Sequence, residues 1–179
     1  MNNQEKQHLD ICWKVFVEET LSRFIKKLNF GRKIIVTAPD ELYIKSRIAD
    51  WCKKNDIVLV YVDCRTITLK EANAIRHQDS FKDKLYVIDH ISEIPDSPDQ
   101  MSIYNMIVSS WKNNESANLI LVKNSDESIE IKEYMNSLRY CSYGYYGPIV
   151  FDPTVEPSGE QQYVMKAKIE KYKELSLLS

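Results

Sequence analysis

Glycine is scarce in this sequence. Only four glycines occur among 179 residues, and the stretch from residue 32 to residue 143 contains none. A nucleotide site usually needs glycine, because glycine backbone turns through positive φ and lies close to a phosphate at little cost. A core without glycine therefore argues against a nucleotide site of the usual kind.

Long apolar runs, paired cysteines and an excess of one charge are also missing. No apolar run approaches the roughly 20 residues that a membrane span needs, and the polar start MNNQEKQHLD predicts no signal peptide. The net charge of -2 predicts no overall basic field for nucleic acid. We expect a cytoplasmic protein whose scattered cysteines are reduced core residues and neither metal ligands nor disulfides: Cys12, Cys52, Cys64 and Cys141.

Apolar patterning predicts strands that alternate with helices. Buried strands are expected at residues 33–38, 57–64, 84–91, 117–125 and 149–152. Helical spacing of apolar residues is found at 6–29, 40–55, 68–77, 101–113, 127–138 and 159–177. Strands that are continuous apolar runs between helices predict a three-layer α/β fold, with a parallel five-stranded sheet covered on both faces.

We expect a single domain over residues 1–179. It would comprise an N-terminal helix (1–31), an α/β core (32–155) and a C-terminal helix (156–179). In open parallel sheets the functional crevice lies beyond the carboxyl ends of the strands. The residues that directly follow each strand are therefore the candidates for a site.

The turn after the first expected strand, PDELYIKS at residues 39–46, raises the question of nucleotide binding. It has the length and the last two letters of a phosphate-binding loop, G-x-x-x-x-G-K-S/T. Pro39 and Ile44 stand where the two glycines should be. Pro39 brings no N–H, and β-branched Ile44 disfavours the backbone that the last glycine adopts.

Asp40 and Glu41 add carboxylates where phosphate groups would lie. Like charges about 4 Å apart cost on the order of a few kcal/mol at a partly shielded surface. We therefore interpret the turn as a strand-to-helix connection, and Lys45 and Ser46 as residues of the helix surface.

Several segments in order resemble P-loop ATPases of the AAA+, STAND and origin-recognition type. EETLSRFIKKLNFGRKIIVTA resembles their opening, IVLVYVDCR their second strand, LYVIDHISEI their Walker B strand and LILVKNS their fourth strand. The resemblance covers about residues 18–151 and implies a P-loop NTPase-like fold.

The resemblance also implies roles for single residues. Lys45 and Ser46 align with the phosphate lysine and the magnesium-binding hydroxyl, Asp89 with the Walker B aspartate and Asn124 with the first sensor. His90 stands where the family has its catalytic glutamate.

Two further features depart from the family. SLRYCS resembles the arginine-containing motif of clamp-loader subunits, but Tyr140, next to Arg139, takes the place of the arginine. Only one helix follows the fifth strand, so the family's helical lid has no room.

These features predict a catalytically inactive AAA+-like core that acts as an adaptor or assembly subunit. The resemblance implies a protein partner, either another AAA+-type subunit or a second copy, and a place beside DNA-replication or mobile-element machinery. We expect no catalytic residues, no cofactor and no membrane contact. The alternative is a weak NTPase that binds ATP and magnesium through Lys45, Ser46, Asp89 and Asn124.

The aromatic turn RYCSYGYYGP suits a protein interface, where tyrosine is enriched. We expect its interaction residues to be Arg139, Tyr140, Tyr143, Tyr145 and Tyr146. A nucleic-acid reading would stack bases on these tyrosines, beside a basic patch of Arg32, Lys33, Lys45 and Arg47. We favour solvated, mixed charges over that reading.

A phosphorelay receiver domain is a further alternative. It would use the acidic pair Asp40–Glu41, Asp89 and Ser125 after successive strands. The lysine that such a domain needs after its fifth strand is missing, and the helix before the first strand is foreign to that fold.

Overall fold

The computed structural model describes residues 2–22, 33–37, 43–76, 84–113, 118–123, 145–150 and 160–178. In chain order, the elements are α1 (Asn3–Phe16), the π-helical turn η1 (Val17–Leu21), β1 (Lys33–Thr37), α3 (Ile44–Lys54), β2 (Val58–Asp63), α4 (Leu69–Arg76), β3 (Lys84–Asp89), the 3-10 turn η3 (Ile91–Glu93), α5 (Gln100–Asn113), β4 (Asn118–Lys123), β5 (Tyr145–Val150) and α7 (Glu160–Leu177). The expected α/β class with a parallel sheet is confirmed.

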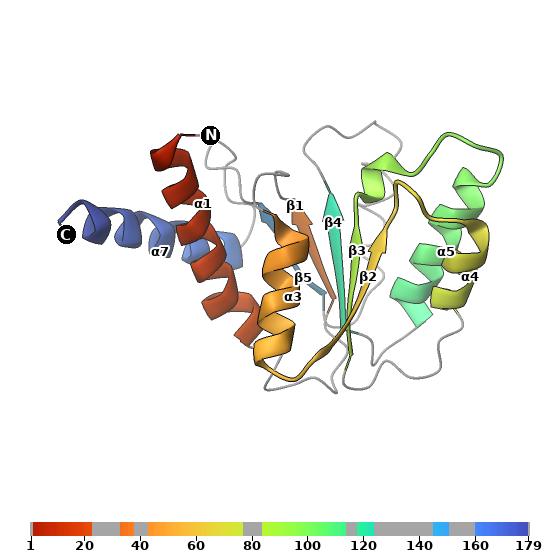
Figure 1. Cartoon of the computed structure of the whole chain (residues 1–179), viewed down its shortest axis with the longest axis horizontal. Coiled ribbons are helices and arrows are strands. Elements are labelled where there is room, and N and C mark those ends of the chain that lie inside the picture. Colours follow the sequence, from red (N-terminus) through yellow and green to blue (C-terminus); the bar gives the residue numbers. More distant parts are fainter. Residues whose placement is uncertain are drawn as a thin grey trace.

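The strands form one sheet in the order β2-β3-β4-β1-β5, and every neighbouring pair is parallel. Helices α1, α3 and α7 cover one face, and α4 and α5 cover the other (Figure 1). The step from β1 to β2 runs along the sheet in the opposite direction to the steps from β2 to β4. If every crossover is right-handed, α3, which connects β1 to β2, must lie on the opposite face from α4 and α5, which connect β2 to β3 and β3 to β4. The structure has this arrangement.

This strand order excludes the receiver alternative. A flavodoxin-like receiver fold has the order 2-1-3-4-5, in which the first strand lies between the second and the third. Here β1 lies between β4 and β5. The crossover from β1 passes over β4 and β3 to reach β2, which is a different topology.

Alternation along the strands divides the core in two. Toward α1, α3 and α7, the sheet presents Ile34, Val36, Leu85 and Val87, all buried. Toward α4 and α5, it presents Tyr86 and Ile88 with Cys64, also buried. Side chains at successive strand positions point to opposite faces, and both faces are apolar because helices cover both.

The first helix begins earlier than its apolar pattern indicates. Asn2 caps α1: its side chain accepts a hydrogen bond from the Glu5 N–H at 2.8 Å, and the Glu5 carboxylate accepts one from the Asn2 N–H at 2.7 Å. This reciprocal pair satisfies two N–H groups that a helix start otherwise leaves without partners. The helix therefore starts at Asn3 and not at residue 6, and its expected end near residue 29 lies outside the described residues.

The fifth strand also begins earlier than expected. Tyr145 and Tyr146 belong to β5 and pair with Lys33 and Ile34, so their assignment to a turn was wrong. Aromatic residues favour strands, and the nearby glycines and proline had indicated a turn. The expected helix at 127–138 lies outside the described residues.

Polar contacts join the π-helical turn to the last helix. Glu19 is buried and forms an ion pair with Lys168 of α7, and the Tyr172 hydroxyl of α7 donates to the Glu18 carboxylate at 2.9 Å. Lys14 lies over the Tyr172 ring, 4.1 Å from its centroid. These contacts fix α7 against α1.

Replacing Lys168 with alanine should lower the free energy of unfolding by about 1 kcal/mol. The buried Glu19 carboxylate would lose this ion pair, and because the Lys168 side chain is 41% exposed, the loss is limited. Urea denaturation measures the change. Lys171→Ala, on an exposed position of the same helix, is the control, and equal stability of both variants would contradict the expectation.

The expected core position is confirmed for three of the four cysteines. Cys12, Cys52 and Cys64 are buried free thiols, and burial raises the pKa of Cys12 and of Cys52 to about 11. Cys141 lies outside the described residues. No helix in the described part of the chain is long and apolar enough to cross a membrane.

Candidate functional site

The last residue of β3 is a buried carboxylate with several partners. Asp89 is 5% exposed. Its Oδ1 accepts the His90 backbone N–H at 2.7 Å, and its Oδ2 accepts the Tyr61 hydroxyl. The His90 Nε2 lies 3.7 Å from the same Oδ2. Both carboxylate oxygens are therefore engaged by the chain itself.

Sheet register explains how Tyr61 reaches this carboxylate. Tyr61 of β2 pairs with Val87, so Asp89 is its diagonal neighbour two residues along β3, on the same face of the sheet. Burial raises the pKa of Tyr61, and the hydrogen bond to Asp89 raises that pKa further. The phenol therefore stays protonated and acts as the donor.

His90 follows in a left-handed backbone conformation, with φ of 56°. This conformation is uncommon outside glycine and marks a position whose surroundings hold it in place. The His90 Nδ1 lies 2.9 Å from a Glu93 carboxylate oxygen, one turn of η3 further on. The backbone N–H of Cys64 donates to the Asp89 carbonyl at 3.0 Å, which ties the end of β3 to the turn after β2.

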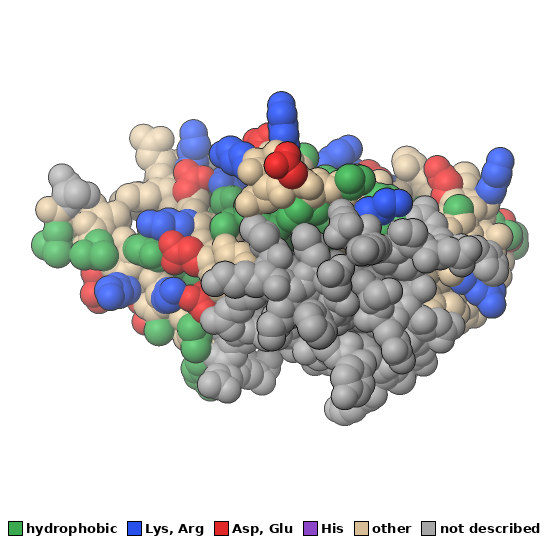
Figure 2. All heavy atoms as spheres, turned by 90° about the horizontal axis from the view of Figure 1, so that it is seen from below, with side chains coloured by type: hydrophobic (Ala, Val, Ile, Leu, Met, Phe, Trp, Pro, Cys, Tyr) green, Lys and Arg blue, Asp and Glu red, His purple; other side chains and the backbone are tan. Residues whose placement is uncertain are grey.

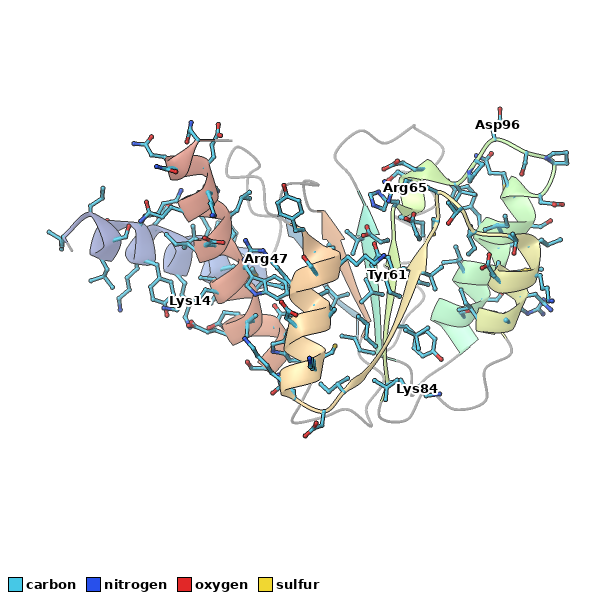
Figure 3. The ribbon with its side chains drawn as sticks, in the orientation of Figure 1. Lys14, Arg47, Tyr61, Arg65, Lys84 and Asp96 are labelled. Atoms are coloured by element: carbon cyan, nitrogen blue, oxygen red, sulfur yellow. The ribbon has the colours of Figure 1, made fainter. Side chains whose placement is uncertain are left out.

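An ion pair closes the end of β2. The Arg65 guanidinium donates to both oxygens of Asp63, at 3.0 and 2.7 Å, and the Arg65 backbone N–H donates to Oδ1 at 3.0 Å. The hydrogen bond from the Arg65 side chain lowers the pKa of Asp63. Figure 3 shows Tyr61 on β2 and Arg65 beyond the end of the strand.

The two candidate residues of the phosphate-loop-like turn lie in the first turn of α3. The Lys45 Nζ lies over the Tyr61 ring, 4.7 Å from its centroid. The Ser46 hydroxyl donates to the Tyr43 carbonyl at 3.0 Å. Tyr43, which precedes the helix, has a left-handed backbone with φ of 51° and caps nothing with its side chain.

The structure therefore brings three of the four nucleotide candidates to one edge of the sheet. Lys45 and Asp89 both contact Tyr61, so that ring lies between them. The fourth, Asn124, lies outside the described residues, as do Arg139, Tyr140 and Tyr143. Among the described residues, no group of three or more His, Cys, Asp or Glu side chains could hold a metal ion.

Sequence reasoning did not single out Tyr61 or Glu93. Two signals were available. Tyr61 is two residues before Asp63, so both point to the same face of the expected strand, and Glu93 follows His90 by three residues, which is helical spacing. The first signal does not identify Asp89 as the partner of Tyr61, because the register between β2 and β3 is a property of the fold.

Two residues of the basic patch that the nucleic-acid alternative requires already have contacts within the chain. Arg47 forms an ion pair with Asp10 at 2.5 Å and lies 6.0 Å from the centroid of the Trp13 ring, and Lys45 lies over Tyr61. The side chains of Arg32 and Lys33 lie outside the described part of the structure. On the face seen in Figure 2, Lys and Arg side chains are interspersed with Asp and Glu in the described regions.

Comparison with known proteins finds distant likenesses in structure. No family model matches the sequence, and no curated protein matches it. The ORC1 protein of Aeropyrum pernix, solved in complex with DNA, is similar at 13% identity with a TM-score of 0.44. The match covers 96% of this chain and 50% of that one, so this chain spans about half the length of that protein.

Proposed function

We propose that this chain is a P-loop NTPase-like core without nucleotide chemistry, which acts as an adaptor or assembly subunit. One observation carries the proposal. Lys45, Ser46 and Asp89, the described residues that would serve a nucleotide, are each engaged by a neighbour in the same chain.

The state of Asp89 is the strongest part of this observation. A carboxylate that assists magnesium must present an oxygen to the ion or to its bound water. Here Oδ1 and Oδ2 already accept hydrogen bonds from His90 and Tyr61 in a buried position. Freeing either oxygen would leave a donor without its partner, at a cost of about 1–3 kcal/mol.

The position after Asp89 supports the same proposal. His90 takes the place of the glutamate that would activate water in the ATPases that the sequence resembles, and its Nδ1 is already within hydrogen-bond distance of Glu93. His90 is buried, and its second ring nitrogen, Nε2, also lies close to a carboxylate, that of Asp89, so neither nitrogen is well placed to take a proton from water.

The assembly role rests on the resemblance to AAA+-type cores, which work in complexes. We propose a cytoplasmic protein partner, either another such core or a second copy, in DNA-replication or mobile-element machinery. Direct DNA binding is not favoured, since Lys45 and Arg47 already have partners. DNA affinity that falls steeply with added salt would contradict this part of the proposal.

Titration with fluorescent ATP in the presence of Mg²⁺ tests the central claim. We expect no saturable binding below about 1 mM, and the same result for Lys45→Ala. Lys53→Ala, at an exposed position near the far end of α3, is the matched control. Micromolar, Mg²⁺-dependent binding that Lys45→Ala abolishes and Lys53→Ala retains would overturn the proposal and favour the alternative that binds ATP and magnesium.

A further inference from the structure

The outer edge of β2 is an exposed edge of the sheet among the described residues. β2 is the terminal strand, and none of the described strands pairs with its outer side. Val58 is 56% exposed, and the other five residues of the strand are partly exposed. Five of its six residues are apolar, in the run VLVYVD.

The features that usually block an exposed edge are absent from β2. Natural edge strands carry lysine, proline or a bulge that prevents pairing with another chain. β2 has neither residue type and pairs with β3 without interruption from Val58 to Asp63. The opposite edge strand, β5, contains Pro148, which lacks an N–H, and its register with β1 is interrupted.

We propose that β2 pairs with β2 of a second copy in an antiparallel arrangement, on a two-fold axis through Val60. This inference rests on the proposed assembly role and names the partner as the same chain. Val58 would lie opposite Val62 of the second copy, and Leu59 opposite its Tyr61. The two sheets would join into one of about ten strands, which open sheets reach.

The pairing register follows from the sequence. A two-fold axis perpendicular to the sheet keeps equivalent faces together, so it must pass through a residue. Moving the axis to Tyr61 would set Leu59 against the charged Asp63. Moving it to Leu59 would set Val62 against Asp56. Only the axis through Val60 pairs all five apolar residues of β2 with one another, and such cross-strand pairs stabilise a sheet; Asp63 then lies opposite Ile57, just before the strand.

Charge at the two ends of β2 favours the antiparallel direction. Lys53 and Lys54 precede the strand, and Lys84, which pairs with Val58, starts the next one. Figure 3 shows Lys84 and Arg65 at opposite ends of the strands. Asp63 and Glu93 outnumber Arg65 by one charge at the carboxyl end, whereas Lys53, Lys54 and Lys84 outnumber Asp56 by two at the amino end. A two-fold axis would therefore bring ends of opposite net charge together.

The turns at the strand ends add a complementary pair. Asp56, in the turn before β2, is exposed, and Arg65, in the turn after it, keeps a half-exposed guanidinium. In the proposed register, the turn that holds Asp56 in one copy faces the turn that holds Arg65 in the other. The two-fold axis generates this contact twice. Arg65 would then lie between its own Asp63 and Asp56 of the second copy.

The molar mass of the full chain in solution tests the dimer directly. Light scattering after size exclusion should give twice the 21.0 kDa chain mass at about 100 µM. Val58→Lys, at an exposed position, should weaken association at least tenfold, and Val60→Lys should give a monomer. Met101→Lys, at a 65% exposed position on α5, should remain a dimer. Circular dichroism checks that each variant is folded.

Cysteine cross-linking tests the register. Val60→Cys should form an intermolecular disulfide under mild oxidation, because the two copies of residue 60 would lie opposite each other. Val58→Cys should not, since its two copies would lie about 13 Å apart along the strands. The unsubstituted chain gives the background from its own cysteines.

Three outcomes would overturn the proposal: a monomeric mass for the unsubstituted chain, a dimer that persists in the folded Val58→Lys and Val60→Lys variants, or equal cross-linking of both cysteine variants. Each is independent of the nucleotide titration. A monomer that binds no ATP refutes the dimer alone, whereas a dimer that binds ATP at micromolar concentration refutes the proposed function alone.

Discussion

Replacing Asp89 with alanine is expected to lower the free energy of unfolding by about 2–4 kcal/mol. The substitution would leave the His90 N–H and the Tyr61 hydroxyl without their acceptor, and each buried donor that loses its partner costs about 1–3 kcal/mol. Urea denaturation of the purified chain measures the change.

This experiment distinguishes a carboxylate that stabilises the fold from one that is kept to bind a ligand. A carboxylate kept for a metal ion often costs stability, so its removal is neutral or stabilising. Asp96→Ala, at an exposed loop position, is the control and should change stability by less than about 0.5 kcal/mol. Tyr61→Phe, which removes only the hydroxyl, should cost about 1 kcal/mol. Equal stability of Asp89→Ala and Asp96→Ala would show that the Asp89 carboxylate does not stabilise the fold.

Phe16→Ala should have the largest effect on stability, a loss of about 3–5 kcal/mol. Phe16, at the end of α1, is completely buried and packs in the same apolar cluster as Ile34, Ile48 and Val87. Its ring centroid lies 5.7 Å from that of Trp13. The lost aromatic ring would leave a cavity at the junction of the first helix and the sheet.

The same variant tests the expected single domain. If the first helix folds with the α/β core, Phe16→Ala lowers the midpoint of one cooperative transition that all probes share. Leu177→Ala, at an 87% exposed position on α7, should stay within about 0.5 kcal/mol of the unsubstituted chain. A separate early transition for the first helix would show that it is not part of the unit.

Local patterns predicted the elements well where the apolar signal was continuous. The runs around Val58–Asp63 and Lys84–Asp89 are strands within one or two residues of their expected limits. Such runs contain β-branched residues bounded by polar turns, so the signal lies in neighbouring residues. The start of β5 was missed because Gly144, Gly147 and Pro148 signal a turn, whereas pairing with β1 holds Tyr145 and Tyr146 in a strand.

The candidate site was predicted only in part. The position of Asp89 at a strand end followed from the sequence, since polar residues end a buried run. Its partner did not, because Tyr61 reaches it only through the parallel register of β2 and β3. The same limit applies to Lys45, whose contact with the Tyr61 ring depends on how α3 lies over the sheet.

The sequence by itself determined the α/β class, the positions of most elements and the absence of glycine from the turn at residues 39–46. These are properties of adjacent residues, namely apolar periodicity and backbone freedom. The tertiary structure alone decided the strand order, the place of β2 at one end of the sheet and the partners of Asp89. Those depend on which distant segments pack together, and the free energy of that packing is spread over the whole core, so no short stretch of sequence displays it.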